Sequence, residues 1–384
     1  MKHQPKTYKF AYYCSGHGFG HATRVIAISL ELISSGHQVY IITSTPKSVF
    51  ESILSNQLIY RSKVIEPKII QPKAYDVDKF ETFDNLDKFI RFDRNRILNE
   101  EIDWLKSEGI QCALVDAPFV PCAAAFQAGI PSVIISNFTF CSCYSYLSMS
   151  TSQSDPLIKS EEVQAPIDPK LLDPLVKIVI SDYSKANLLL RLPGSIPIPG
   201  FDTDVELPST KWVNLAKHSF QDHIHNLLDR SIQDIPRPVI DLPLVFRKIS
   251  KSIYKPNQKL SLLKLLNLPT SLQTLNTKIL LISFGGQVIP RPKPIQTSEN
   301  TNSPFFDILP PGWIAIVCGS SVDGLTSQDA LDRFYPIPKT FSYVPDLTAL
   351  SDVVMGKLGY GTCSETLATM TPFIYDQCLL KNTD

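Results

Sequence analysis

The sequence predicts an α/β fold made of two domains, each with a parallel sheet that helices cover on both faces. Three observations lead to this prediction. Short apolar runs rich in β-branched residues alternate with segments of helical periodicity, which is typical of strands buried on both faces. The alternation breaks near residue 202 and resumes near residue 277. At 384 residues, the chain is long enough for two domains that each have a core of their own.

The first domain begins with the run YKFAYYC (8–14), which predicts a strand. The segment 22–36 places Val25, Ile28 and Leu32 on one helical face and ends at a glycine, so it predicts a helix. The same patterns predict the remaining elements of this domain, which are strands at 37–44, 110–117, 131–137 and 176–182 and helices at 94–109 and 120–129.

A linker or insertion is predicted over 202–277, because this range carries four prolines within 236–256 and has no regular alternation apart from helical parts such as 212–232. The alternation then resumes, with strands predicted at 277–286, 312–319, 339–345, 350–356 and 371–376, a loop at 288–311 and a helix at 363–370. We therefore expect an amino-terminal domain at 1–201, the linker at 202–277 and a carboxyl-terminal domain at 278–384, with a cleft between the two domains.

The composition excludes several classes of protein. Hydrophobic residues make up 43% of the chain and charged residues 19%, which is typical of a folded protein. Lys+Arg and Asp+Glu balance at 37 each, so we expect no nucleic-acid partner and no anionic membrane partner. The apolar part of the amino terminus is too short for a signal peptide, and no run is long enough to span a bilayer. The 8 cysteines form no C-x-x-C pair, so the expected location is the cytoplasm, with no zinc or disulfide framework.

A glycine-rich turn, CSGHGFGHATR, follows the first predicted strand. Its glycines are Gly16, Gly18 and Gly20, and His21 stands where a dinucleotide-binding fingerprint has its last glycine. The second strand also ends without the acidic residue that would bind a ribose hydroxyl, so hydride chemistry is disfavoured. A P-loop kinase is disfavoured as well, because the chain has no G-x-x-x-x-G-K-[ST] motif.

Three readings of this turn remain open. Backbone N–H groups at a helix start favour an anionic or hydroxyl-rich ligand. His17 and His21 are four residues apart, a spacing that can bind zinc on a helix, but the glycines between them favour a loop and no third ligand is near. The third reading is a plain tight turn with solvated histidines.

A second glycine loop, VVMGKLGYGTCSETLATM (353–370), is more informative. Gly359 and Gly361 permit close approach of a ligand, and Thr362 with Glu365 forms a capping-box pattern at a predicted helix start. The functional alternative is that the helix start binds a diphosphate while Glu365 binds a ribose, with Lys357 as a compensating or solvated charge. A third loop, SFGGQ, follows another predicted strand and contains Gly285, Gly286 and Gln287.

These segments together resemble a known family. They are similar to the amino-terminal half of L-arabinokinase-type proteins, and more widely to GT-B nucleotide-sugar glycosyltransferases of the family 28-like kind. The segments that carry this resemblance are YYCSGHGFGHATRVI, SDYSKA, RPVIDLPLVFRK, LLISFGGQ, LPPGWIAIVCG and MGKLGYGTCSETLA. The resemblance extends from about residue 8 to about residue 375, with only patches in 202–277. It implies a GT-B fold, in which two Rossmann-like domains face a cleft.

The resemblance also implies roles for individual residues. The loop Gly16–Gly20 with His21 would face the acceptor and the transferred sugar. The nucleotide sugar, of the UDP-linked kind, would be bound by Gly285, Gly286, Gln287, Lys357, Gly359, Gly361, Thr362 and Ser364, with Glu365 on the ribose. Enzymes of this fold usually need no tightly held metal ion or other cofactor.

The base for a hydroxyl acceptor would be His21, His17 or Asp116. Asn137, at the end of another predicted strand, is a candidate for binding the nucleotide sugar. Asp116 and Asn137 also have ordinary alternatives as turn formers or helix caps.

Three functions follow from these expectations. The leading one is transfer of a hexosyl-type sugar from a nucleoside diphosphate to a small-molecule or glycan acceptor. The second is a non-catalytic module that binds a nucleotide sugar, with a sugar kinase as a possible partner, and the third is a nucleotide-sugar epimerase. In the family a GHMP-type kinase half follows this region, and CGSSVDG (318–324) lacks the surrounding pattern of such a kinase. The last predicted strand leads only into DQCLLKNTD, so we expect a truncated second domain.

Overall fold

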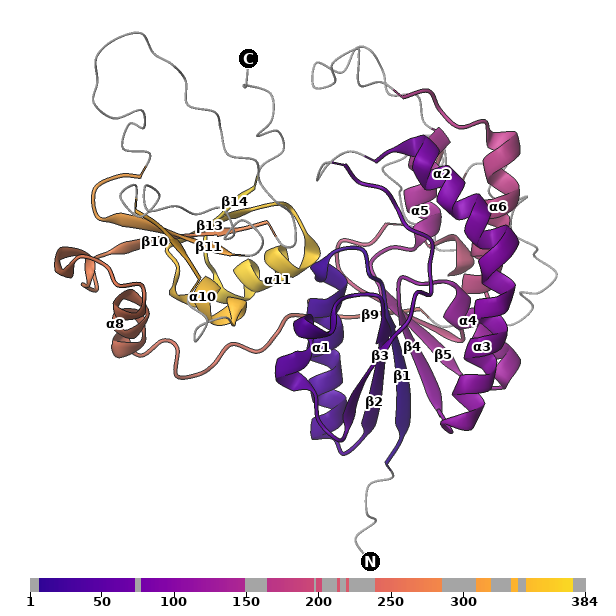
Figure 1. Cartoon of the computed structure of the whole chain (residues 1–384), viewed down its shortest axis with the longest axis horizontal. Helices are drawn as coiled ribbons and strands as arrows, with labels where there is room; N and C mark the ends of the chain where they lie inside the picture. Colours follow the sequence, from indigo (N-terminus) through magenta and orange to yellow (C-terminus); the bar gives the residue numbers. More distant parts are fainter. Residues whose placement is uncertain are drawn as a thin grey trace, which may run out of the picture. The chain divides into compact units, whose positions relative to one another are not determined.

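Two compact units make up the chain, unit 1 (Met1–Val245) and unit 2 (Phe246–Asp384) (Figure 1). The computed structural model describes residues 7–72, 77–148, 164–196, 198–201, 213–214, 219–220, 239–284, 309–318, 333–337 and 343–375. Each unit contains one large parallel sheet with helices packed on it, so the predicted α/β class with two Rossmann-like domains is confirmed.

Unit 1 is built on a seven-stranded parallel sheet with the order β3-β2-β1-β4-β5-β6-β9. Its strands are β1 (Lys9–Cys14), β2 (Gln38–Thr43), β3 (Leu58–Ser62), β4 (Cys112–Asp116), β5 (Ser132–Ser136), β6 (Leu188–Arg191) and β9 (Val239–Asp241). The order reverses between β1 and β4, which is where open α/β sheets leave a crevice at the carboxyl ends of their strands. Cys14 pairs with Asp116 across this point, so both strands end side by side.

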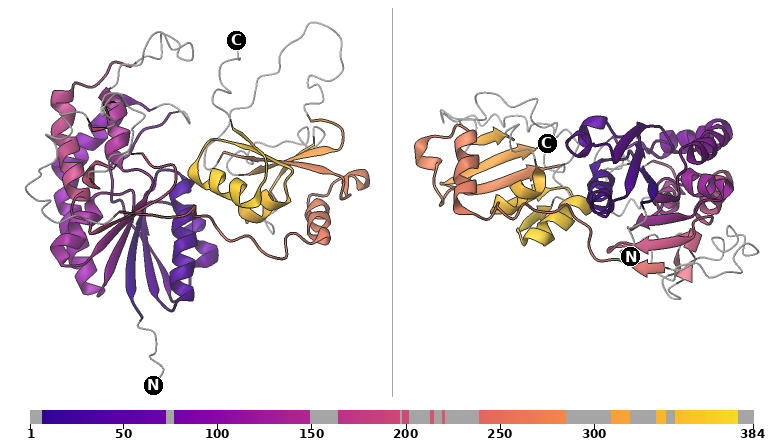
Figure 2. Two further views of the ribbon diagram at one scale, coloured as in Figure 1. Left: turned by 180° about the vertical axis from the view of Figure 1, so that it is seen from behind. Right: turned by 90° about the horizontal axis from the view of Figure 1, so that it is seen from below.

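Helices cover both faces of this sheet, with α1 on one face and α3, α4 and α6 on the other (Figures 1 and 2). The helices are α1 (Phe19–Ser34), α2 (Lys79–Lys88), α3 (Arg94–Ser107), α4 (Val120–Ala128), α5 (Phe140–Ser145) and α6 (Pro169–Tyr183). Alternate residues of β1 and β4, such as Ala11, Tyr13 and Val115, are buried in one cluster with apolar residues of α3, α4 and α6. The predicted helices at 22–36, 94–109 and 120–129 are confirmed.

Unit 2 has a five-stranded parallel sheet with the order β12-β11-β10-β13-β14, which reverses between β10 and β13. Its elements are α8 (Pro256–Leu265), β10 (Lys278–Ser283), β11 (Trp313–Cys318), β12 (Phe334–Pro336), α10 (Val344–Leu350), β13 (Val353–Gly356), α11 (Tyr360–Thr369) and β14 (Phe373–Tyr375). Leu262 and Leu263 of α8 pack with Ile279, Ile314 and Leu347 in the core.

One predicted strand is wrong. The range 176–182 lies in α6, where Leu172, Val176, Val179 and Ile180 are buried at helical spacing and Asp168 caps the helix by accepting from the Lys170 N–H. A short run of β-branched residues does not by itself distinguish a buried helix from a buried strand. The strand of this part of the sheet is β6, which follows the helix.

The described parts of 202–277 are divided between the units. β9 pairs with β6 in unit 1, whereas α8 belongs to the core of unit 2. Where a helix was predicted at 212–232, the described residues form two short antiparallel strands, β7 (Val213–Asn214) and β8 (Ser219–Phe220). The expected domain boundaries and the expected cleft remain predictions.

Some predictions fall wholly or partly outside the described residues. Gly285, Gly286 and Gln287 lie there, as do most of the loop 288–311 and the first part of the strand predicted at 339–345. The last residues of that predicted strand open α10 instead. Within the described ranges, no helix is long and apolar enough to cross a membrane.

Candidate functional site

The first glycine loop turns across the end of β4. Gly18 has a φ of 76° and precedes α1, a backbone conformation that glycine adopts at little cost. The Ser15 N–H donates to the carbonyl of Asp116 at 3.1 Å, which fixes the loop to the neighbouring strand end. The loop therefore places the first turn of α1 directly over the carboxyl end of β4.

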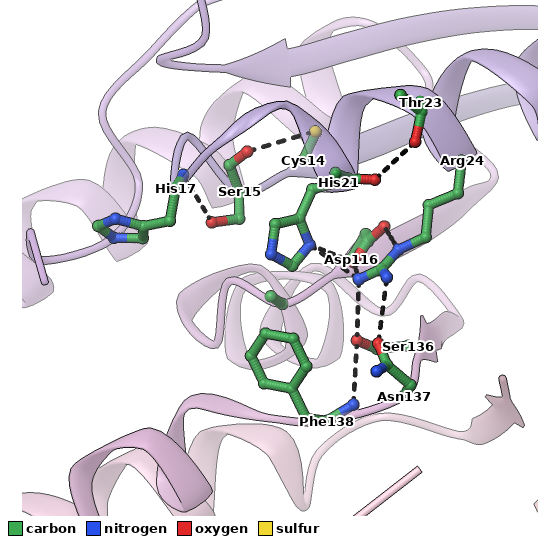
Figure 3. Close-up of polar contacts among 12 residues, drawn as sticks. Cys14, Ser15, His17, His21, Thr23, Arg24, Asp116, Ser136, Asn137 and Phe138 are labelled. Atoms are coloured by element: carbon green, nitrogen blue, oxygen red, sulfur yellow. Dashed lines mark hydrogen bonds and ion pairs between the residues drawn. The ribbon is translucent and has the colours of Figure 1, made fainter. Parts of the chain in front are cut away.

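The structure brings His21 and Asp116 together. His21 lies in the first turn of α1, and its Nδ1 is 2.9 Å from Oδ1 of Asp116 at the end of β4 (Figure 3). The His21 side chain is only 8% exposed and the Asp116 side chain is fully buried. Phe138, just after β5, packs edge-on against the imidazole at a centroid distance of 5.6 Å. Two of the predicted base candidates thus form one hydrogen-bonded pair.

A third charged side chain, Arg24, joins this pair. It binds Asp116 in a bidentate manner, through Nε to Oδ2 and through Nη2 to Oδ1 at 2.5 Å. Its Nη1 donates to Oδ1 of Asn137 at 3.1 Å, so the amide oxygen of this predicted sugar-binding residue is engaged within the protein. Sequence reasoning missed Arg24. Its spacing of three residues from His21 places both on one side of the helix, but this spacing does not indicate burial.

The protonation states in this cluster follow from burial and charge. Burial lowers the pKa of His21, Arg24 lowers it further, and Asp116 only opposes the shift, so His21 is neutral at pH 7. Burial alone would raise the pKa of Asp116, but Arg24 and His21 together hold this pKa below its usual value. The result is an ionised carboxylate beside a neutral imidazole.

His17 lies apart from this pair. Its side chain points away from Asp116 (Figure 3), and its Nε2 is 3.0 Å from the carbonyl oxygen of Pro67. Burial lowers the pKa of His17, so it too favours the neutral form. Among the described residues there is no group of three or more His, Cys, Asp or Glu side chains placed to hold a metal ion.

Glu66 is a second residue that sequence reasoning missed. Its Oε1 accepts from the Ser15 hydroxyl at 2.8 Å and from the Gly16 N–H at 2.7 Å. Burial raises the pKa of Glu66 to about 8, so this carboxyl holds a proton at neutral pH. Because Glu66 lies far from the loop in sequence, no local pattern indicates the contact. One N–H group of the glycine loop is therefore already occupied.

The second glycine loop lies between β13 and α11. The capping box predicted from Thr362 and Glu365 is wrong, because α11 begins earlier, at Tyr360, after Gly359. Glu365 instead accepts from Nε of Arg247 at 2.8 Å, and both side chains are largely buried. The structure thus shows an internal partner for the residue that was predicted to bind ribose.

The other predicted residues of this loop lie close together around the start of α11. Gly361 and Ser364 are buried, and the Ser364 hydroxyl donates to the Tyr360 carbonyl at 2.7 Å. Lys357 is partly buried, and burial lowers its pKa. Nucleotide binding by this loop remains a prediction for Lys357, Gly359, Gly361, Thr362, Ser364 and Glu365.

The sequence of the chain is similar to part of one known protein. No family model matches the chain. Over 367 residues the chain is 30% identical to the L-arabinokinase of Arabidopsis thaliana, which is 95% of this chain but 28% of that protein. The chain therefore spans less than a third of the length of this relative.

Two solved structures are similar to the chain as a whole. The glycotransferase of kitacinnamycin has 15% identity and a TM-score of 0.50, with 99% of this chain and 82% of that chain covered. TcCGT1 in complex with UDP has 14% identity and a TM-score of 0.50, with 96% and 81% covered. The chain has the fold of these GT-B glycosyltransferases, and at such low identity the likeness shows the fold alone.

Proposed function

We propose that this chain is a glycosyltransferase that binds a UDP-linked sugar and transfers its hexosyl group to a hydroxyl of a small-molecule or glycan acceptor. The observation that carries this proposal is the buried pair of His21 and Asp116 at the carboxyl edge of the unit 1 sheet. The similar structure of TcCGT1 contains UDP, which supports a uridine nucleotide as the donor group.

His21 would act as the base. When its Nδ1–H donates to Asp116, the lone pair of the neutral ring is on Nε2. Nε2 would take the proton of the acceptor hydroxyl while the hydroxyl oxygen forms a bond to the anomeric carbon of the sugar. The bond from that carbon to the diphosphate breaks, and the diphosphate leaves with the electron pair. Asp116 would stabilise the imidazolium that forms.

The second glycine loop would bind the leaving diphosphate. The first N–H groups of α11, around Gly359, Gly361 and Thr362, carry a partial positive charge, and Lys357 adds a full one. These groups can stabilise the developing negative charge without a metal ion. Because Oε1 of Glu365 already accepts from Arg247, a ribose hydroxyl would bind at Oε2 of Glu365 or compete with Arg247 for Oε1.

A second candidate is a non-catalytic module that binds a nucleotide sugar. Two observations favour it. Glu365 already accepts a hydrogen bond from Arg247, and the chain matches only a segment of a longer protein that is named a kinase. In such a protein a sugar kinase could be the partner. In such a module the start of α11 in unit 2 would still bind the nucleotide, but His21 would have no catalytic role.

Differential scanning calorimetry with a panel of nucleoside diphosphates and their sugars tests both candidates. We expect a saturable rise in melting temperature, equivalent to about 2.7 kcal/mol at a ligand concentration of 100 times Kd. Lys357→Ala should reduce this rise, while Lys251→Ala, an exposed lysine in the same unit, should not. Release of the nucleoside diphosphate on addition of acceptors separates the transferase from the module. No stabilisation by any member of the panel would contradict both candidates.

A further inference from the structure

We propose that Arg24 is a positioning residue, which holds the Asp116 carboxylate in place and thereby determines which ring nitrogen of His21 carries the proton. The catalytic consequence of this assignment rests on the proposed function. The assignment itself concerns the state of His21 in the folded chain, which can be measured without any substrate.

Arg24 is buried where a charge is costly. Its side chain is 2% exposed on the face of α1 that also buries Ala22, Val25 and Ile26. A guanidinium in such surroundings is stable only when it is paired and hydrogen-bonded. A packing role alone would be filled at lower cost by an apolar side chain, so the reason for an arginine here lies in its partners.

Those partners come from the ends of two adjacent strands. The Nε and Nη2 groups bind both oxygens of Asp116 at the end of β4. Nη1 donates to Asn137, and Nη2 lies 3.4 Å from the hydroxyl oxygen of Ser136, both at the end of β5. The planar fork therefore fixes the carboxylate in a single orientation, which a lysine could not do.

The same fork reaches the imidazole. Nη2 of Arg24 is 2.8 Å from Nδ1 of His21, and Nδ1 is 2.9 Å from Oδ1 of Asp116. Nδ1 thus has a donor and an acceptor within hydrogen-bond distance, and it can serve only one of them at a time. Either hydrogen bond would be charge-assisted. The two N–H groups of Nη2, however, already have Asp116 and Ser136 as acceptors, so donation from Nδ1–H to Asp116 is favoured and the lone pair is left on Nε2.

Arg24 also limits how strongly Asp116 attracts a proton to the imidazole. Without the guanidinium, the buried carboxylate would face His21 alone and would stabilise the imidazolium, which cannot act as a base. Within the described part of the chain, the other titratable groups near this pair carry little charge at neutral pH. Burial raises the pKa values of Tyr12 and Cys14 well above their usual ranges, Glu66 is protonated at neutral pH, and His17 favours its neutral form.

Nuclear magnetic resonance of the full chain with isotope-labelled histidine tests the assignment. His21 signals are identified from their loss in His21→Gln, and their shifts with pH report the pKa and the tautomer of the ring. In the wild type we expect a neutral ring with the proton on Nδ1 at pH 7. In Arg24→Gln the pKa of His21 should rise by about one unit or more, because the Asp116 charge is no longer neutralised.

Three further variants sharpen the test. Arg24→Lys should keep the charge but lose the fork, so the pKa of His21 should stay low while the two tautomers become mixed. Asp116→Asn should lower the pKa further and favour the proton on Nε2, because Nδ1 then accepts from Arg24. Arg96→Gln removes an exposed arginine on α3 and should change neither property.

An unchanged pKa and tautomer of His21 in Arg24→Gln would overturn the assignment. If that variant does not fold, an unchanged tautomer in both Arg24→Lys and Asp116→Asn would overturn it equally. These readouts do not depend on turnover. A chain that transfers no sugar but shows the expected shifts contradicts the proposed function alone, and a transferase that shows none of them contradicts the role of Arg24 alone.

Discussion

Around the loop between β1 and α1, three buried ionisable residues differ in charge at neutral pH: Asp116 is ionised, whereas His21 and Glu66 are neutral. Asp116 is ionised because Arg24 pairs with it, and His21 is neutral because burial outweighs the attraction of Asp116. Glu66 keeps its proton because burial dominates over the hydrogen bonds from Ser15 and Gly16. Neighbouring groups whose pKa values are moved apart in this way are typical of sites that transfer protons.

The titration of Glu66 predicts a pH-dependent stability. Its folded-state pKa of about 8 lies above the ordinary value of 4.5, so its contribution is complete below that ordinary value and is lost as the pH rises through 8. The free energy of unfolding should therefore fall by about 1.4 kcal/mol per pH unit in this window, relative to Glu66→Gln.

Urea unfolding of the wild type and of Glu66→Gln measures this difference in the free energy of unfolding. The range from pH 5 to 8, about three units, lies between the ordinary and the raised pKa of Glu66. Glu51→Gln, which changes an exposed glutamate, should unfold in parallel with the wild type at every pH. A constant difference between the wild type and Glu66→Gln would show that Glu66 does not titrate in this window.

Part of this cluster could be predicted from the sequence. Asp116 and Asn137 lie at the ends of predicted strands, and His21 directly precedes a predicted helix. The ends of parallel strands meet at one edge of the sheet. Arg24 was missed because a helical arginine is usually solvated, and only the three-dimensional pairing with Asp116 shows that it is buried. Glu66 was missed because its contact with Gly16 joins two loops that are distant in sequence.

Among the secondary-structure elements, the pair of β10 and β13 determines the geometry of the second glycine loop. A Cβ atom on Gly356 would lie 2.2 Å from the carbonyl oxygen of Ser283 on the neighbouring strand. On Gly359 the nearest atom would be Cε of Lys357 at 3.9 Å, an ordinary contact. The packing of the two strands thus requires a glycine at position 356. At position 359 the packing does not require one, so a glycine there is consistent with close approach of a ligand.

A matched pair of substitutions follows from this difference. Gly356→Ala should destabilise unit 2 by about 1–3 kcal/mol or more, because backbone atoms of two paired strands must separate. Gly359→Ala should cost about 0.5 kcal/mol or less, as its φ of −108° suits any residue. Hydrogen exchange of the β10 and β13 amides measures both effects, and similar exchange rates in the two variants would contradict the role of Gly356.

The elements themselves were predictable where their ends carry a local signal. The helices at 22–36 and 120–129 end at or just before Gly36 and Gly129, which both have positive φ angles. The run 176–182 was predicted as a strand because its β-branched residues hide a helical repeat that starts earlier, at Leu172. The short edge strands β9, β12 and β14 depend on pairing with longer neighbours, which no local pattern reveals.

At the level of the whole molecule, both units repeat the same design. Each has a parallel sheet whose order reverses next to its first strand in the chain, and each has a glycine loop at that point, before α1 in unit 1 and before α11 in unit 2. Such reversals are where open α/β sheets bind ligands. The fold does not assign the chemistry, so the functional proposal depends on His21 and Asp116 in unit 1 and on the start of α11 in unit 2.

The most direct test of the proposal compares the turnover of the wild type with that of His21→Ala. Turnover is measured as release of nucleoside diphosphate from a saturating nucleotide sugar, with acceptor present. We expect His21→Ala to lose 10²–10⁴-fold in turnover, roughly the contribution of a general base, while it keeps the thermal stabilisation by nucleotide. His37→Ala, which removes a histidine before β2 at the opposite end of the sheet, should retain full turnover. Equal turnover in the wild type and His21→Ala would contradict the proposed role of His21.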